Sequence, residues 1–194
     1  MQSEKRRINA VMKPKMRNSI ANTVKIALFA AIISVTAMIT IPFAVPITLQ
    51  ALGVFSALFI LGGKRGCVAV AVYVAIGAVG IPVFSGFTGG IGRLFDLTGG
   101  FIWGFILAAL AFWLCEIIFS KSRAFFIVAP TVSLLIIYLS GCIQFAIVSS
   151  SNGNSVGFVS VLTACVLPFI LLDILKIILA YIISRRLKRI MPKI

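Results

Sequence analysis

The sequence has no histidine, and its 4 Asp and Glu residues stand against 18 Lys and Arg residues in a chain of 194. Without histidine there is no imidazole base, no His-ligated metal and no HExxH motif. The spaced aspartates of phosphatidyl-group transferases and the GxxxxGK[ST] phosphate-binding loop are also absent. We therefore expect no enzyme, no metal site and no cofactor, and any coupling to ATP has to come from other subunits.

Cysteine is present but sparsely placed. The four residues, Cys67, Cys115, Cys142 and Cys165, are far apart and form no CxxC pattern. All lie among apolar residues, where cysteine usually behaves as a small hydrophobe. We expect neither a disulfide framework nor a thiolate metal site.

Apolar side chains are abundant. The chain is 61% hydrophobic and 11% charged, with a mean hydropathy of +1.16, whereas a soluble domain is about 45–50% apolar and about 25% charged. A nucleic-acid-binding protein could carry the net charge of +14. Here, however, the basic residues are dispersed over tails and short turns without interleaved stacking aromatics. The composition predicts one compact membrane domain and no binding of nucleic acid.

Charges and turn residues divide the chain into apolar segments. A helix needs about 20 apolar residues to cross a bilayer core about 30 Å thick. We therefore expect an all-α membrane protein with six transmembrane helices, near residues 20–41, 47–61, 67–84, 100–119, 124–148 and 168–183. An irregular Gly-rich outer loop is expected between the third and fourth helices. Because Pro168 would break a longer final helix, residues 156–165 are expected to form a short interfacial helix.

The basic residues are segregated along this pattern. Sixteen of the eighteen lie in residues 1–25, in the turns at 62–66 and 120–123, and after residue 184. The positive-inside rule then places both termini in the cytoplasm, in a multi-pass protein of the plasma membrane. The domain organisation predicted is a basic cytoplasmic tail (1–19), a six-helix transmembrane substrate-binding domain (20–184) and a second basic tail (185–194). The tails should also contact anionic membrane lipid.

Membrane topology does not account for the charged residues Arg93, Asp173 and Lys176, which lie outside the predicted cytoplasmic segments. An ionisable group inside the membrane is costly unless it is paired or wetted, so it is a functional candidate by default. Asp173 and Lys176 are three residues apart and share a helix face, either as a structural ion pair or as the polar wall of a ligand cavity. Arg93 ends an apolar, Gly-rich run (residues 86–93), which is either a flexible turn or part of a pocket on the outer side. Two cations and one carboxylate predict an anionic ligand with a hydrogen-bond-donating end and an apolar middle.

The first apolar segment carries small residues at helical spacing. Ala27 and Ala31 form a small-xxx-small pair, which lets helices approach closely in lipid. Packing within the bundle and docking of a partner protein are both consistent with this pair.

Several short runs together resemble one family. They are Pro46-Ile47-Thr48-Leu49-Gln50, Gly77-Ala78-Val79-Gly80-Ile81-Pro82-Val83-Phe84, Gly89-Gly90, Thr98-Gly99-Gly100-Phe101, and Leu167-Pro168-Phe169 with Asp173 and Lys176. Over about residues 25 to 184 the chain resembles the BioY family, the biotin-binding S components of energy-coupling factor (ECF) transporters. The resemblance implies a six-helix membrane protein that captures biotin at an outward-facing pocket. It also implies partners: an ECF transmembrane coupling subunit and two cytoplasmic ATPases.

The resemblance also implies roles for individual residues. Arg93, Asp173 and Lys176 match binding positions, residues 42–50 match a loop that closes over the site, and Ala27 and Ala31 match a docking motif. The biotin carboxylate would be held by Arg93 or Lys176, the ureido N–H by Asp173, and the ring and chain by aromatics. The remaining expected contacts are Phe84, Phe87 or Trp103 and the backbone at Gly89 and Gly90.

The chain departs from the family pattern in two places. Asp96-Leu97 stands where the family usually has Gly-Pro, and Gly86 stands where some members have Asn. Gln50 and Ser85 are therefore the expected substitutes for the missing polar contact. An S component for riboflavin or thiamin, or a stand-alone secondary transporter, are the alternative functions.

Overall fold

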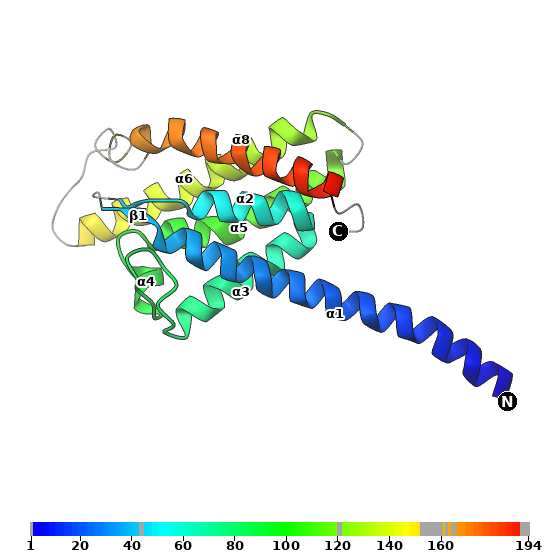
Figure 1. Ribbon diagram of the computed structural model, residues 1–194. Coiled ribbons are helices and arrows are strands. Elements are labelled where there is room, and N and C mark those ends of the chain that lie inside the picture. The colour runs from blue at the N-terminus through cyan, green and yellow to red at the C-terminus, as the bar shows by residue number, and fades with distance from the viewer. Residues whose placement is uncertain are drawn as a thin grey trace.

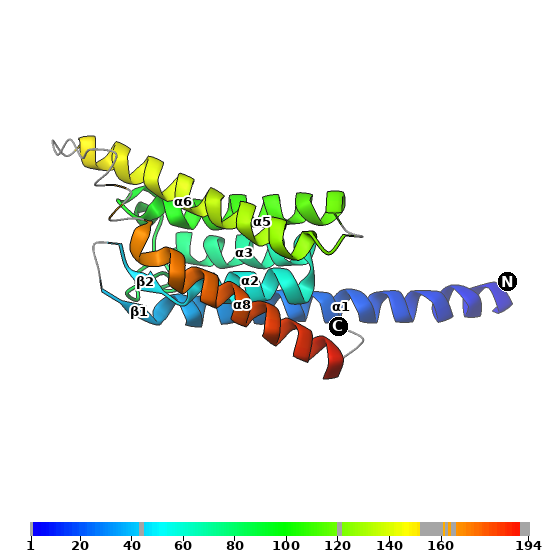
Figure 2. The same ribbon diagram turned by 90° about the horizontal axis from the view of Figure 1, so that it is seen from above.

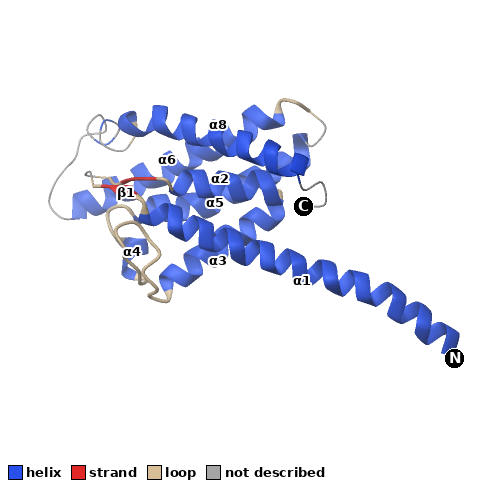
Figure 3. Ribbon diagram, in the orientation of Figure 1, coloured by secondary structure: helices blue, strands red, loops and turns tan. Residues whose placement is uncertain are grey.

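The computed structural model describes residues 2–42, 45–119, 122–151, 161, 163 and 166–190. This part of the chain forms seven helices and one two-stranded hairpin (Figures 1 and 3). The helices are α1 (Gln2–Met38), α2 (Gln50–Leu61), α3 (Gly63–Ala78), α4 (Gly92–Phe95), α5 (Gly99–Phe119), α6 (Phe125–Ser151) and α8 (Leu167–Ile190). In the hairpin, β1 (Thr40–Ile41) pairs antiparallel with β2 (Ile47–Thr48).

The prediction of six transmembrane helices is wrong. In the described residues, four helices are long and apolar enough to cross a membrane: Ser19–Met38 within α1, and α5, α6 and α8. The 12 residues of α2 and the 16 residues of α3 extend about 18 Å and about 24 Å at 1.5 Å per residue. Both are shorter than a bilayer core of about 30 Å.

Backbone turns explain why these two helices are short. Gly62 lies between α2 and α3 with a φ of 83°, a left-handed conformation that glycine adopts without steric cost. Helix α3 ends at Ala78, and Gly80 follows with a φ of 112°. Residues 79–84, which the hydropathy pattern assigns to a third transmembrane helix, form an irregular turn instead.

The short helix α2 lies at the centre of the bundle. Eleven of its twelve residues are buried, and it packs against α1, α3 and α8. Helices α5 and α6 pack closely along their length because small residues face each other: a Cβ on Gly100 would lie 2.4 Å from the carbonyl oxygen of Ser140. The longer helices carry exposed apolar residues on their outer faces, as expected where lipid is the solvent.

The two ends of the bundle differ in character. Both ends of the described chain, the α2–α3 turn and the start of α6 lie at one end, and the hairpin, α4 and the Gly-rich segment lie at the other (Figures 1 and 2). The basic turn residues Lys64, Arg65 and Arg123 therefore gather at the end where α8 finishes. Glu116 of α5 is at the same end and accepts the backbone N–H of Gly63 at 2.7 Å, which fixes the start of α3.

Two predictions concern segments at the edges of the part of the chain that the structure describes. Helix α1 begins at Gln2 and runs as one helix through the segment predicted as a tail, extending beyond the bundle (Figure 2). The division into two tails and a domain stays a prediction. The interfacial helix expected at residues 156–165 lies outside the described residues, except for residues 161 and 163.

Candidate substrate-binding site

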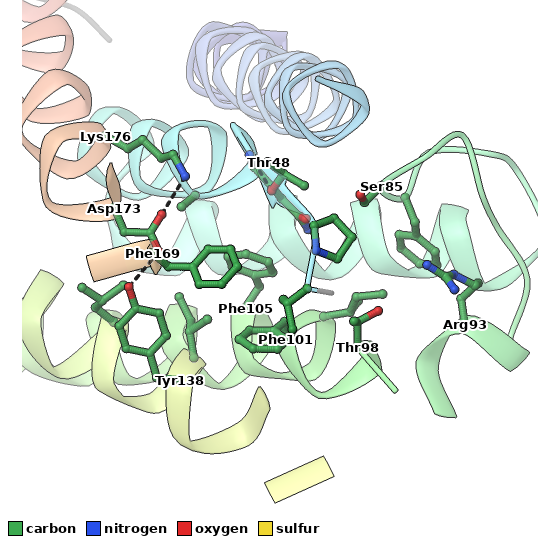
Figure 4. Close-up of a pocket in the computed structure, with 18 residues that line it drawn as sticks. Thr48, Ser85, Arg93, Thr98, Phe101, Phe105, Tyr138, Phe169, Asp173 and Lys176 are labelled. Carbon is green, nitrogen blue, oxygen red and sulfur yellow. Dashed lines mark hydrogen bonds and ion pairs between the residues drawn. The ribbon is translucent and has the colours of Figure 1, made fainter. Parts of the chain in front are cut away.

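A cavity opens between the hairpin and helices α2, α5, α6 and α8. Counted together with the open space at its mouth, its volume is about 740 Å³. Figure 4 shows Asp173, Lys176 and Tyr138 toward one end of the cavity, and Arg93 with Ser85 at the opposite end. The lining therefore has two polar ends.

The first polar end is a cluster built on Asp173. Lys176 Nζ donates to Asp173 Oδ1 at 2.7 Å, and the hydroxyl of Tyr138 donates to Asp173 Oδ2 at 2.9 Å. Asp173 and Lys176 are 7% and 8% exposed. Because each charge is compensated by the other, the pair can lie in a low-dielectric environment without a net charge. Sequence reasoning placed Asp173 and Lys176 on one face, but it missed Tyr138, which comes from α6.

Gln50, in the first turn of α2, lines the same cavity. It is buried, and its Nε2 donates to the hydroxyl of Tyr73 at 3.0 Å. This bond orients the amide, and its carbonyl oxygen stays available as an acceptor for a ligand N–H. Gln50 lines the cavity, so the structure brings it together with Asp173 and Lys176. Tyr73 was not among the residues selected from the sequence.

The second polar end is formed by Arg93 of α4 and by Ser85. Ser85 Oγ donates to Thr40 Oγ1 of β1 at 3.1 Å, which connects the Gly-rich segment to the hairpin. Arg93 forms an ion pair with Asp96 through Nη1, and its Nε is buried without a hydrogen-bond partner among the described residues. Both Arg93 and Ser85 line the cavity.

Aromatic rings form the walls between the two ends. Phe84 is 1% exposed and packs edge-on against Tyr73, with ring centroids 5.6 Å apart. Gly77 makes room for this ring, because a Cβ there would lie 2.2 Å from Phe84 Cζ. Three further rings complete the apolar lining, from Phe101, Phe105 and Phe169 (Figure 4). A side chain at position 77 would push Phe84 into the cavity.

Other residues selected from the sequence lie away from the lining. Phe87 is 68% exposed and has a φ of 57°. Gly89 packs on the backbone of Ile81, and the Gly90 N–H donates to the Gly77 carbonyl at 2.7 Å. Trp103 faces the outside of the α5–α6 pair and lines a separate groove there. These glycines let the segment fold back onto the end of α3.

The loop expected to close over the site is the hairpin and its connection. Val45, Pro46 and Thr48 line the cavity, and the Leu49 N–H donates to the Ile39 carbonyl at 3.1 Å. Residues 43 and 44 lie outside the described chain. In the part that is described, the hairpin borders the cavity at the end of the bundle opposite the chain ends (Figure 1).

Ala27 and Ala31 lie far from this cavity. They are exposed on α1 and line a shallow groove together with Ala30 and Ser34 and with residues of α3. Within the described chain, no three His, Cys, Asp or Glu side chains gather as a metal ligand set.

The chain has apolar helices of membrane length, and they surround a cavity with polar groups at both of its ends. These features define the class of protein: a multi-pass membrane protein with a candidate small-molecule site. A family model for the BioY family matches residues 8–193, and the chain belongs to that family. It is a family of transporter components and not of enzymes.

Individual relatives agree with this assignment. The chain is 39% identical over 170 residues to the biotin transporter BioY of Thermotoga maritima, covering 86% of this chain and 95% of that one. It is 39% identical over 164 residues to a probable biotin transporter BioY of Pyrococcus horikoshii, covering 84% and 93% of the two chains. The fold is similar to a crystal structure of the S component for biotin from an ECF-type ABC transporter. That similarity has a TM-score of 0.76 and 25% identity, over 89% of this chain and 93% of the other.

Proposed function

We propose that this protein is the biotin-binding S component of an ECF-type uptake transporter. The observation that carries the proposal is the cavity itself, with a buried Asp173–Lys176 pair at one end and Arg93 at the other. Biotin has a polar ureido ring, an apolar thioether and alkyl chain, and a terminal carboxylate. The polar, apolar and anionic parts of biotin therefore follow one another in the same order as the polar cluster, the aromatic walls and Arg93 along the cavity. The relatives of the protein named above are biotin transporters.

The cavity supplies partners of the right kind for each part of biotin. Asp173 and the Gln50 carbonyl accept hydrogen bonds, so they suit the ureido N–H groups. Lys176 and the Tyr138 hydroxyl donate, so they suit the ureido oxygen. Arg93 suits the carboxylate, because a guanidinium can hold it with two parallel bonds. Lys176 and Arg93 each already pair with a carboxylate, but Arg93 keeps an N–H, at Nε, that has no partner within the described chain, and this favours Arg93 as the partner of the ligand carboxylate.

Transport requires other subunits. The sequence has no phosphate-binding loop, so we infer that ATP hydrolysis takes place in other subunits, which the resemblance to the BioY family implies are two cytoplasmic ATPases and a transmembrane coupling subunit. The exposed groove with Ala27 and Ala31 is the docking surface that we propose for this subunit. Small side chains on an exposed helix face permit close approach of a partner helix in the membrane.

Equilibrium binding of radiolabelled biotin to the purified chain tests the ligand. Unlabelled biotin should displace the label, and riboflavin and thiamin should not. Displacement by either of these vitamins at the concentration that suffices for biotin would contradict the proposal.

Uptake measurements test the mechanism. Cells that produce this chain together with the coupling subunit and the ATPases should accumulate biotin, and omission of the ATPases should abolish accumulation. Full uptake without them would identify a stand-alone transporter instead.

A further inference from the structure

Asp96 lies next to Arg93 at the mouth of the cavity. Its Oδ2 accepts Arg93 Nη1, and its Oδ1 accepts the backbone N–H of Leu97 at 2.7 Å. The carboxylate is therefore held on both oxygens, although 47% of the Asp96 side chain is exposed. Its position relative to Arg93 is fixed by its own backbone and not by the ion pair alone.

The turn that carries both residues is anchored to α5 and α6 by side chains that lie outside the cavity. Gln144 Nε2 of α6 donates to the carbonyls of Asp96 and Leu94, at 2.7 Å and 2.9 Å. Trp103 Nε1 of α5 donates to the Leu94 carbonyl at 3.1 Å. Helix α4 has only four residues, so these three bonds supply the rigidity that it lacks by itself. The turn that carries the Asp96 carboxylate is thus fixed to α5 and α6.

The choice of nitrogen in this ion pair matters for ligand binding. One edge of a guanidinium, formed by Nε–H and an N–H of Nη2, matches the two oxygens of a carboxylate. Nη1 lies outside that edge, and Nη1 is the atom that Asp96 holds. Nε is buried and has no hydrogen-bond partner within the described chain. A buried donor without a partner is unfavourable, and a ligand carboxylate would satisfy it once the protein atoms that cover Nε make room.

We propose that Asp96 is a positioning residue, which holds Arg93 by Nη1 so that the Nε–Nη2 edge stays free for the carboxylate of the ligand. This inference rests on the proposed function, in which Arg93 binds the carboxylate of biotin. Without Asp96, the long Arg93 side chain would sample more rotamers and would lose that freedom on binding. In this arrangement the guanidinium would lie between Asp96 and the ligand carboxylate, and its positive charge offsets their mutual repulsion.

The test compares two ligands on the purified full-length chain: biotin, and biotin amide, in which the carboxylate is replaced by a neutral carboxamide. Asp96→Ala should weaken biotin binding about tenfold, which corresponds to ~1.4 kcal/mol. It should change the affinity for biotin amide less than about twofold, since the amide has no anionic pair of oxygens for Arg93 to hold with two parallel bonds. Retained binding of the amide also shows that the variant is folded. Asp96→Asn keeps one acceptor oxygen, which can serve Arg93 or the Leu97 N–H but not both, so it should lose less biotin affinity than Asp96→Ala.

A double-mutant cycle with Arg93→Gln completes the test. In the Arg93→Gln background, Asp96→Ala should have no further effect on biotin binding, because there is no guanidinium left to position. An equal loss for biotin and biotin amide would show a merely structural role and overturn the inference. Unchanged or tighter biotin binding by Asp96→Ala would also overturn it, since Asp96 would then be neutral or a competitor. If the wild-type chain binds neither ligand, the proposed function fails and the inference fails with it.

Discussion

Replacement of Asp173 by asparagine removes a carboxylate that Lys176 and Tyr138 share. Lys176 would keep its ammonium group in a site where it is only 8% exposed, but without the anion that now lies 2.7 Å away. Removal of one partner from a buried ion pair costs about 3–5 kcal/mol, because it leaves an uncompensated charge. We expect a loss of that order in the free energy of unfolding of Asp173→Asn, measured in detergent micelles.

The same substitution should weaken biotin binding. A hydrogen bond to a charged group contributes about 1.5–3 kcal/mol, and this corresponds to a loss of about 10- to 150-fold in affinity at about 1.4 kcal/mol per factor of ten. The asparagine amide still has an oxygen for the Tyr138 hydroxyl, so the geometry of the cluster should be largely kept. Equilibrium dialysis with radiolabelled biotin measures this loss.

A double variant separates stability from binding. Asp173→Asn with Lys176→Met replaces the ion pair by uncharged side chains of similar size, and such replacements are often neutral or stabilising. We expect the double variant to regain most of the stability that Asp173→Asn loses, while its affinity for biotin stays low. If the double variant binds biotin as tightly as the wild-type chain, the pair is only structural and the assignment of the site is wrong.

Two further predictions concern other surfaces. Ala27→Trp with Ala31→Trp should spare biotin binding but prevent co-purification with the coupling subunit and the ATPases, and a loss of biotin binding would instead place these alanines in packing essential to the site. Gly77→Ala should cost about 1–3 kcal/mol of stability, as overpacking does, and should weaken biotin binding in the same assays, because its Cβ would lie 2.2 Å from Phe84 Cζ. Gly92→Ala is the matched control, since a Cβ there meets no atom within 4 Å, and equal behaviour of the two variants would contradict the packing argument.

Hydropathy predicted the long helices well and the short ones badly. The segments expected at residues 100–119 and 124–148 correspond closely to α5 and α6. The errors in α2 and α3 have different causes. Helix α2 is enclosed by protein, so an apolar composition did not require membrane length, whereas α3 has an exposed face and is cut short by the turn after Ala78. The turn after Ala78 is also apolar, and hydropathy alone could not distinguish it from helix.

The candidate site shows a similar limit. Spacing along one helix was enough to predict that Asp173 and Lys176 share a face, and the structure places them in contact. Tyr138 is 35 residues away from Asp173 in the chain, so only the packing of α6 near α8 brings it into the cluster. The partner of Arg93 was missed for a different reason, because Asp96 was considered only as a departure from the family pattern. Local spacing within one turn would have signalled that ion pair.

A structure of the protein with biotin bound tests the central claim most directly. The account predicts biotin in the cavity, with its ureido ring against Asp173, Lys176 and Tyr138, its alkyl chain between the phenylalanine rings, and its carboxylate on the Nε–Nη2 edge of Arg93. Biotin in the reverse orientation, or bound outside this cavity, would contradict the account.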